Sequence, residues 1–236
     1  MPLSKSTIAE VIKYCNRDLV PDQDFDSDSQ YHSEWFVEYF SFLQDHKLEM
    51  QLGDAFYQTR FIYKLMSALN LPLAKQKGIV KFQIIQYASI CEAVLDAAIA
   101  RYFKKDTAKD FSTTVLQKIP QAVSKNTQIM IEYNKTPLFL CKEKTVECNP
   151  KKARIDTKTA FAVSKGLIKQ NTSEAVKSLY DLRNNVHILK ATDRNYTPRL
   201  KEAKEAFELM QVFIGEVRDY YETHPVKQET REPACV

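Results

Sequence analysis

Glycine is scarce in this chain, with only 4 among 236 residues. Glycine-rich phosphate-binding loops need several glycines, because the backbone must approach a phosphate closely in conformations that other residues avoid. Folds with many tight β-turns also place glycine at turn positions with a positive φ angle. The composition therefore argues against a glycine-rich nucleotide-binding loop and against a predominantly β fold.

Long apolar runs are missing as well. No continuous apolar stretch reaches the ~20 residues that a membrane-spanning helix needs. The first residues, MPLSKSTIAEVIKYC, lack the apolar core of a signal peptide. The hydrophobic content of 44% is ordinary for a soluble globular protein. We therefore expect a cytoplasmic protein that does not act at a membrane.

Cysteine and histidine do not form a metal-binding pattern. The five cysteines are odd in number and scattered, and no pair has the spacing of a zinc-binding CxxC motif. The acidic run DQDFDSDS is similar to the start of a calcium-binding loop, but it lacks the glycine at the bend and the glutamate at the twelfth position. We therefore expect reduced thiols, no bound metal and no cofactor.

Charge is distributed unevenly along the chain, although the net charge is only +4. Residues 1–59 carry a net charge of −7, and residues 135–169 carry one of +6. The basic stretch predicts contacts with RNA phosphates, and the acidic stretch would suit a basic partner. Two solvated surfaces of opposite sign would explain the same pattern. The candidate RNA-binding residues are Lys142, Lys144, Lys151, Lys152 and Arg154.

Apolar residues recur at helical spacing through most of the chain, which predicts an all-α helical bundle. We expect residues 1–72 to form extra N-terminal helices packed on a helical domain of residues 73–224. Residues 225–236 read as a disordered tail. The expected helices include residues 31–47, 48–69, 81–103, 111–124, 174–190 and 198–222.

The first two of these helices are rich in aromatic residues. Such aromatic stripes usually form the core of a bundle, because each ring buries a large apolar area. A surface on which RNA bases stack is the alternative interpretation.

One segment interrupts the helical pattern. Two short β-prone runs, residues 138–141 and 145–148, flank the tripeptide Lys-Glu-Lys. This arrangement predicts a small β-hairpin inserted at about residues 137–150. Its lysines would either steer RNA phosphates or form a solvated tip.

The run EAVKSLYDLRNNVHILK, residues 174–190, predicts an amphipathic helix with a candidate site at its edge. Arg183 and His187 lie one turn apart on one face, and Asn184 points nearby. An arginine binds phosphate oxygens with two parallel donors, and a histidine transfers protons near neutral pH because its unperturbed pKa is ~6.5. The buried seam of this helix is expected to be Ala175, Leu179, Leu182, Val186 and Leu189.

The run LRNNVH within this helix resembles the HEPN motif, in which an arginine precedes a histidine late in a long helix. HEPN domains are all-α bundles, and many are metal-independent ribonucleases of defence, toxin and RNA-processing systems. In this chain three residues separate Arg183 from His187, whereas the usual motif has four to six. The resemblance implies a HEPN-like bundle that acts as a homodimer, with a neutralising or regulatory protein as a further partner.

Glu92 lies among apolar positions of the expected helix over residues 81–103. A carboxylate near a core is costly unless it is paired. The resemblance implies that Glu92 pairs with Arg183 or orients His187. An exposed position at the edge of the helix is the alternative.

The predicted function is a metal-independent endoribonuclease that leaves a 2′,3′-cyclic phosphate and acts as a toxin or phage-defence effector. Its catalytic residues would be Arg183, Asn184, His187 and Glu92. The alternative is a catalytically inactive HEPN-like module that binds RNA, a nucleotide or a protein. In a purely structural module, Arg183 and His187 would only hold a helix interface together.

Overall fold

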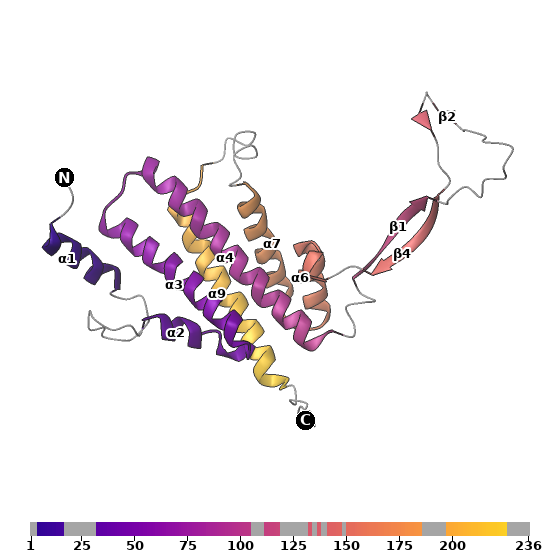
Figure 1. Cartoon of the computed structure of the whole chain (residues 1–236), viewed down its shortest axis with the longest axis horizontal. Helices are drawn as coiled ribbons and strands as arrows, with labels where there is room; N and C mark the ends of the chain where they lie inside the picture. The colour runs from indigo at the N-terminus through magenta and orange to yellow at the C-terminus, as the bar shows by residue number, and fades with distance from the viewer. Residues whose placement is uncertain are drawn as a thin grey trace, which may run out of the picture.

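A bundle of long α-helices with a projecting β-hairpin makes up the described part of the chain (Figure 1). This arrangement confirms the expected all-α fold with a small β-hairpin. The computed structural model describes residues 4–16, 32–104, 111–118, 132–133, 136–137, 141–147, 150–185 and 197–225.

Helix α4 (Leu73–Tyr102) is the centre of the bundle and packs against α3 (His46–Ala68), α6 (Ile155–Ser164), α7 (Gln170–Asn185) and α9 (Leu200–Thr223). The helix expected over residues 81–103 is thus present, but it begins earlier, at Leu73. Its buried side chains repeat at three and four residues and include Ile84, Ala88, Cys91, Leu95 and Ala98.

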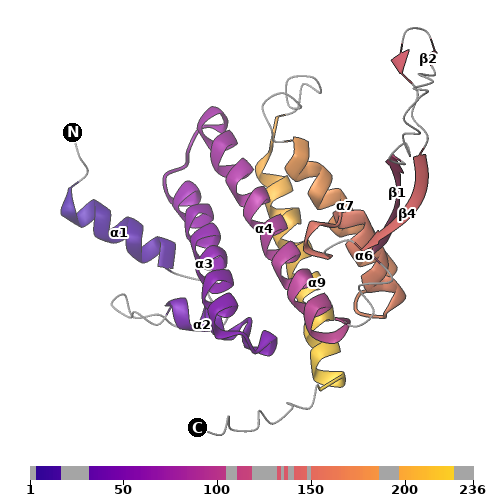
Figure 2. The ribbon, with the colours of Figure 1, turned by 45° about the vertical axis from the view of Figure 1, so that its right-hand side comes forward.

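Helix α9 packs along α4 and closes the bundle (Figure 2). The helix expected over residues 198–222 matches its observed bounds closely. Its buried positions follow the expected spacing of three and four residues. They include Ala203, Met210, Ile214, Val217 and Tyr221.

In the N-terminal region the helix expected over residues 48–69 is confirmed by α3, but the one expected before it is not. Helix α1 (Lys5–Asn16) packs on α3. The prediction of a single helix over residues 31–47 is wrong. Helix α2 (His32–Glu38) ends early, and a 3₁₀ turn, η1 (Ser41–Leu43), follows it. The backbone of Gln44 has a φ angle of 57°, and Asp45 then caps α3 by accepting a hydrogen bond from the Leu48 N–H.

The aromatic residues of this region lie in the core. Phe36, Phe40 and Phe56 are buried, and the rings of Phe36 and Phe56 meet edge to face with centroids 4.9 Å apart. These three rings therefore pack the fold and are not open to nucleic-acid bases.

The β-hairpin is formed by segments other than those expected. Strand β1 (Ser112–Lys118) pairs antiparallel with β4 (Cys141–Glu147), and Thr114 lies opposite Thr145. The described part of the expected helix over residues 111–124 is thus a strand, and the expected Lys-Glu-Lys turn lies inside β4. A second short pair, β2 (Glu132–Tyr133) and β3 (Thr136–Pro137), lies farther out. Both views show this hairpin extending away from the helices (Figures 1 and 2).

One described stretch, Gln76–Tyr102 within α4, is long and apolar enough to cross a membrane by length and composition. In its most apolar window 56% of the residues are buried inside the bundle. Helix α4 therefore has the character of a core helix.

Candidate functional site

The start of α7 is anchored by Glu216 of α9. Its Oε2 accepts a hydrogen bond of 2.9 Å from the backbone N–H of Lys169, and its Oε1 accepts one of 2.9 Å from the Thr172 hydroxyl. A carboxylate at a helix N-terminus also interacts favourably with the helix dipole. These contacts fix the direction in which α7 runs along the bundle.

The buried face of α7 leads to Arg183. Val176, Leu179 and Tyr180 are buried, whereas Leu182 is only half-buried. Leu179 is therefore buried as expected, but Val176 is buried in place of the half-buried Ala175, and Tyr180 is buried in addition. Arg183 follows Tyr180 by one turn, and its guanidinium carbon is 5.1 Å from the centre of the Tyr180 ring. The Arg183 side chain is 31% exposed, which places it at the edge of the bundle as expected.

Glu92 of α4 pairs with Arg183, as one of the two interpretations of its position predicted. Its Oε2 accepts a hydrogen bond from Nη1 of Arg183 over 3.5 Å. The Glu92 side chain is 34% exposed, so both partners lie where the core meets solvent. The pair holds the guanidinium against the central helix.

A buried lysine extends this pair into a network. Nζ of Lys158, on α6, lies 2.8 Å and 3.0 Å from the two carboxylate oxygens of Asp96 and 3.5 Å from Oε1 of Glu92. No part of the Lys158 side chain is exposed. A buried ammonium ion is costly unless it is paired, and two carboxylates from one face of α4 meet that need.

The network alternates in charge from Asp96 through Lys158 and Glu92 to Arg183. It joins α4, α6 and α7, which lie side by side in both views (Figures 1 and 2). The two carboxylate oxygens of Glu92 are divided between two cations: Oε1 faces Lys158 and Oε2 faces Arg183. Lys158, inside the network, is inaccessible to solvent, whereas Arg183 at one end is partly exposed.

Tyr180 borders the same carboxylate. Burial raises the pKa of the Tyr180 hydroxyl, and the hydrogen-bonding interaction with Glu92 and the charge of that carboxylate raise it further, despite the opposing effect of Arg183. The hydroxyl is buried beside the Glu92 carboxylate. Tyr180 therefore stays neutral at physiological pH, and its ring supports the Arg183 guanidinium.

The remaining motif residues are only partly placed. Asn184 lies in the last turn of α7 and is half-buried. His187 lies outside the described residues, as do the expected seam positions Val186 and Leu189. The structure thus brings Arg183 to Glu92, with Asn184 next along the helix.

The candidate RNA-binding residues fall into two groups. Lys142 and Lys144 are exposed on β4. Lys152 and Arg154 are exposed just before α6, the helix that carries Lys158, and Arg154 pairs with Asp156 at 3.1 Å. Lys151 lies between these groups in the short turn η2 (Pro150–Lys152).

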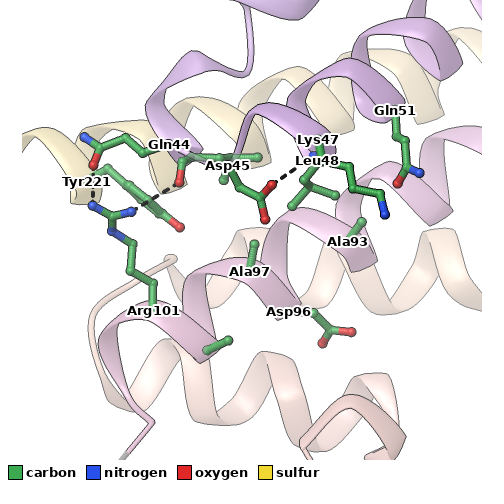
Figure 3. A pocket seen from close by; sticks show the side chains of 12 residues that line it. Gln44, Asp45, Lys47, Leu48, Gln51, Ala93, Asp96, Ala97, Arg101 and Tyr221 are labelled. Atoms are coloured by element: carbon green, nitrogen blue, oxygen red, sulfur yellow. Dashed lines mark hydrogen bonds between the residues drawn. The ribbon is translucent and has the colours of Figure 1, made fainter. Parts of the chain in front are cut away.

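A pocket of about 640 Å³ opens between α4 and the start of α3 (Figure 3). Asp96 lies on its α4 side, so this carboxylate both pairs with Lys158 and borders the pocket. Arg101, also on α4, donates hydrogen bonds to the Leu43 carbonyl over 3.3 Å and to the Gln44 side chain at the edge of this pocket. No local sequence pattern indicates this pocket, because its residues come from three separate segments.

Lys158 and Asp96 are the members of the network that sequence reasoning missed. The signal was present in the spacing. Lys158 precedes the buried residues Phe161 and Ala162 by three and four positions, so it lies on the apolar face of α6. Asp96 follows Glu92 by one turn on α4. Two acids one turn apart beside a core, and a lysine on a buried helix face, indicate an internal ion pair.

No protein-family model, curated protein or solved structure matches the chain.

Proposed function

We propose that this chain is a metal-independent endoribonuclease of the HEPN type, in which Arg183 binds the scissile phosphate and His187 transfers protons. The observation that carries the proposal is the Arg183 side chain, which is paired with Glu92 at 3.5 Å through Nη1 and is still 31% exposed. An arginine held in place at the edge of a bundle is suited to bind a phosphate from solvent.

Arg183 supplies the charge that the reaction needs. When the RNA 2′-hydroxyl attacks the adjacent phosphorus, negative charge grows on the phosphoryl oxygens. Within the described residues, only Nη1 of Arg183 has a hydrogen-bond partner, so Nη2 and Nε can donate to two of these oxygens. Asn184, the next residue of α7, offers a neutral donor to the same group.

His187 performs the proton transfers in this proposal. A base removes the proton of the 2′-hydroxyl, the new bond from oxygen to phosphorus forms, and the bond to the 5′-oxygen breaks. An acid gives a proton to that leaving oxygen. The products are a 2′,3′-cyclic phosphate and a 5′-hydroxyl, and an imidazole with a pKa near ~6.5 suits either proton step. A homodimer would supply two such sets of groups across one cleft.

The direct test is cleavage of a single-stranded RNA in EDTA. We expect the wild-type protein to cut, and His187→Ala to lower kcat/KM by roughly 10²–10⁴-fold, the usual contribution of a positioned acid or base. His46→Ala is the matched control, because His46 is exposed and lies outside the motif. Equal activity of the wild type and His187→Ala would contradict the proposal.

A catalytically inactive HEPN-like binding module is the second candidate. It is favoured by the ion pair itself, because an arginine already engaged by a carboxylate can serve binding and stability without chemistry. Such a module would retain RNA in a salt-sensitive manner but leave it uncut. Binding of uncleaved RNA that is lost in Arg183→Ala would identify this case.

A role as a toxin or phage-defence effector, held in check by a neutralising protein in the cytoplasm, belongs to the same proposal. The corresponding experiment is expression in cells. We expect growth arrest with the wild-type protein and relief of that arrest with His187→Ala at equal protein level.

A further inference from the structure

We propose that Lys158 is a positioning residue that keeps the contact between Glu92 and Arg183 limited to one hydrogen bond. Lys158 occupies Oε1 of Glu92 at 3.5 Å, and this leaves only Oε2 for Arg183. The guanidinium of Arg183 therefore keeps a pair of donors for a phosphate. The inference rests on the proposed function for its biological meaning, but its geometric claim is testable without RNA.

The geometry shows why Lys158 is suited to this role. An arginine and a carboxylate left alone favour a fork with two parallel hydrogen bonds. Here a single contact of 3.5 Å joins Nη1 of Arg183 to Glu92, which is long for a charge-assisted hydrogen bond. The second oxygen of Glu92 faces an ammonium group instead.

Asp96 keeps Lys158 in this position. Both of its carboxylate oxygens lie within 3.0 Å of Nζ, so Lys158 is held more tightly by Asp96 than by Glu92. The Lys158 side chain is fully buried and touches no solvent. It therefore acts on a phosphate only through Glu92 and Arg183, and it is not itself a catalytic residue.

A single and a double substitution should have opposite effects on the freedom of Arg183. In Lys158→Met both oxygens of Glu92 become available, so Arg183 closes into the two-bond fork and withdraws from phosphate. In Lys158→Met/Glu92→Gln the competing carboxylate charge is gone, and Arg183 is released again. A purely structural role for Lys158 predicts no such rescue by a second substitution.

The quantity to measure is the rate at which the Arg183 guanidinium rotates. Side-chain NMR of the full chain reports this rate. The resonance is assigned by its loss in Arg183→Lys. We expect Lys158→Met to slow this rotation about tenfold, since one more charge-assisted hydrogen bond must break. The double variant should return to the wild-type rate or exceed it. Lys169→Met, which removes an exposed lysine, should leave the rate unchanged.

If Lys158→Met does not fold, the single variant Glu92→Gln provides a second measurement of the same contact. Glu92 is partly exposed, so this substitution is mild, and rotation of Arg183 should become about tenfold faster. Unchanged rotation in either Lys158→Met or Glu92→Gln overturns the inference.

Binding of a 2′-O-methyl RNA oligonucleotide, which cannot be cut, separates this inference from the proposed function. We expect Lys158→Met to weaken binding about tenfold and the double variant to recover it. If rotation responds as expected but no variant, including the wild type, binds this oligonucleotide, the positioning role stands and the proposed function fails. Binding that does not change in Lys158→Met overturns the inference.

Discussion

Nζ of Lys158 lies 2.8 Å from Oδ1 of Asp96, although no part of the Lys158 side chain reaches solvent. This ion pair connects α6 to the central helix, and Glu92 continues it to Arg183 at the end of α7. The candidate site is thus supported by charges inside the bundle.

Lys158→Met should destabilise the fold, because it leaves Asp96 and Glu92 without their shared cation. Removing one partner of a buried ion pair typically costs several kcal/mol, and we expect about 3 kcal/mol here because the carboxylates are partly exposed. Urea denaturation measures the change. Adding Asp96→Asn should recover part of the loss. Lys169→Met, in an exposed pair with Glu216, should cost less than about 1 kcal/mol.

The long helices could be predicted from the sequence because their apolar residues repeat over many turns. The seam of α9, with Met210, Ile214 and Val217, is one example, and these residues are buried as expected. Strand β1 could not be predicted in the same way. Its pairing partner, β4, is distant in sequence: Thr114 lies opposite Thr145, 31 positions later, and local periodicity does not encode such a pairing. The charged run in β4 was misread as a turn because a projecting strand exposes its lysines.

The candidate site could be predicted only in part. Arg183 was predicted because it lies at the edge of an amphipathic helix in a run that resembles the HEPN motif, and Glu92 because it carries a charge among apolar positions. Lys158 was missed because a lysine in a short helix is ordinarily solvated, and its burial depends on acids supplied by another helix. His187 lies outside the described residues, so its role stays a prediction.

Gly53 marks the closest approach of α2 and α3. A Cβ atom at this position would lie 2.8 Å from the backbone nitrogen of Val37. Gly53→Ala should therefore destabilise the fold by about 1–3 kcal/mol through overpacking. Gly78→Ala is the matched control in another helix, where a Cβ meets nothing within 4 Å. It should stabilise by about 0.5–1 kcal/mol, so equal thermal shifts in the two variants would refute this packing.

Tyr180 should make the fold sensitive to alkaline pH. Its pKa is raised above the usual value of about 10, first by burial and then by Glu92, so the folded state holds a proton that the unfolded state releases. The free energy of unfolding should fall as pH rises above about 10. In Tyr180→Phe this slope should be smaller by about 1.4 kcal/mol per pH unit. Urea titrations of both proteins across this range measure it, and identical slopes would exclude a raised pKa.

Lys142 and Lys144 of β4 should contribute to RNA binding through charge alone. If both contact phosphates, replacing them with glutamine should lower the slope of log affinity against log salt by about 1.4, from ~0.7 per contact on a single strand. Lys201→Gln/Lys204→Gln removes two exposed lysines of α9 and is the control. A slope that changes equally in both variants would show a general effect of net charge.

The most direct test of the central claim is the chemistry of the RNA ends produced in EDTA by the wild-type protein, Arg183→Lys and Arg183→Ala. The account predicts 2′,3′-cyclic phosphate ends with the wild type. It also predicts a loss of roughly 10²–10³-fold in rate with Arg183→Ala, since the main stabiliser of the phosphoryl charge is gone. Arg183→Lys keeps the charge without the fork and should be intermediate. Intact RNA with the wild type, or equal cleavage by all three proteins, would contradict the account.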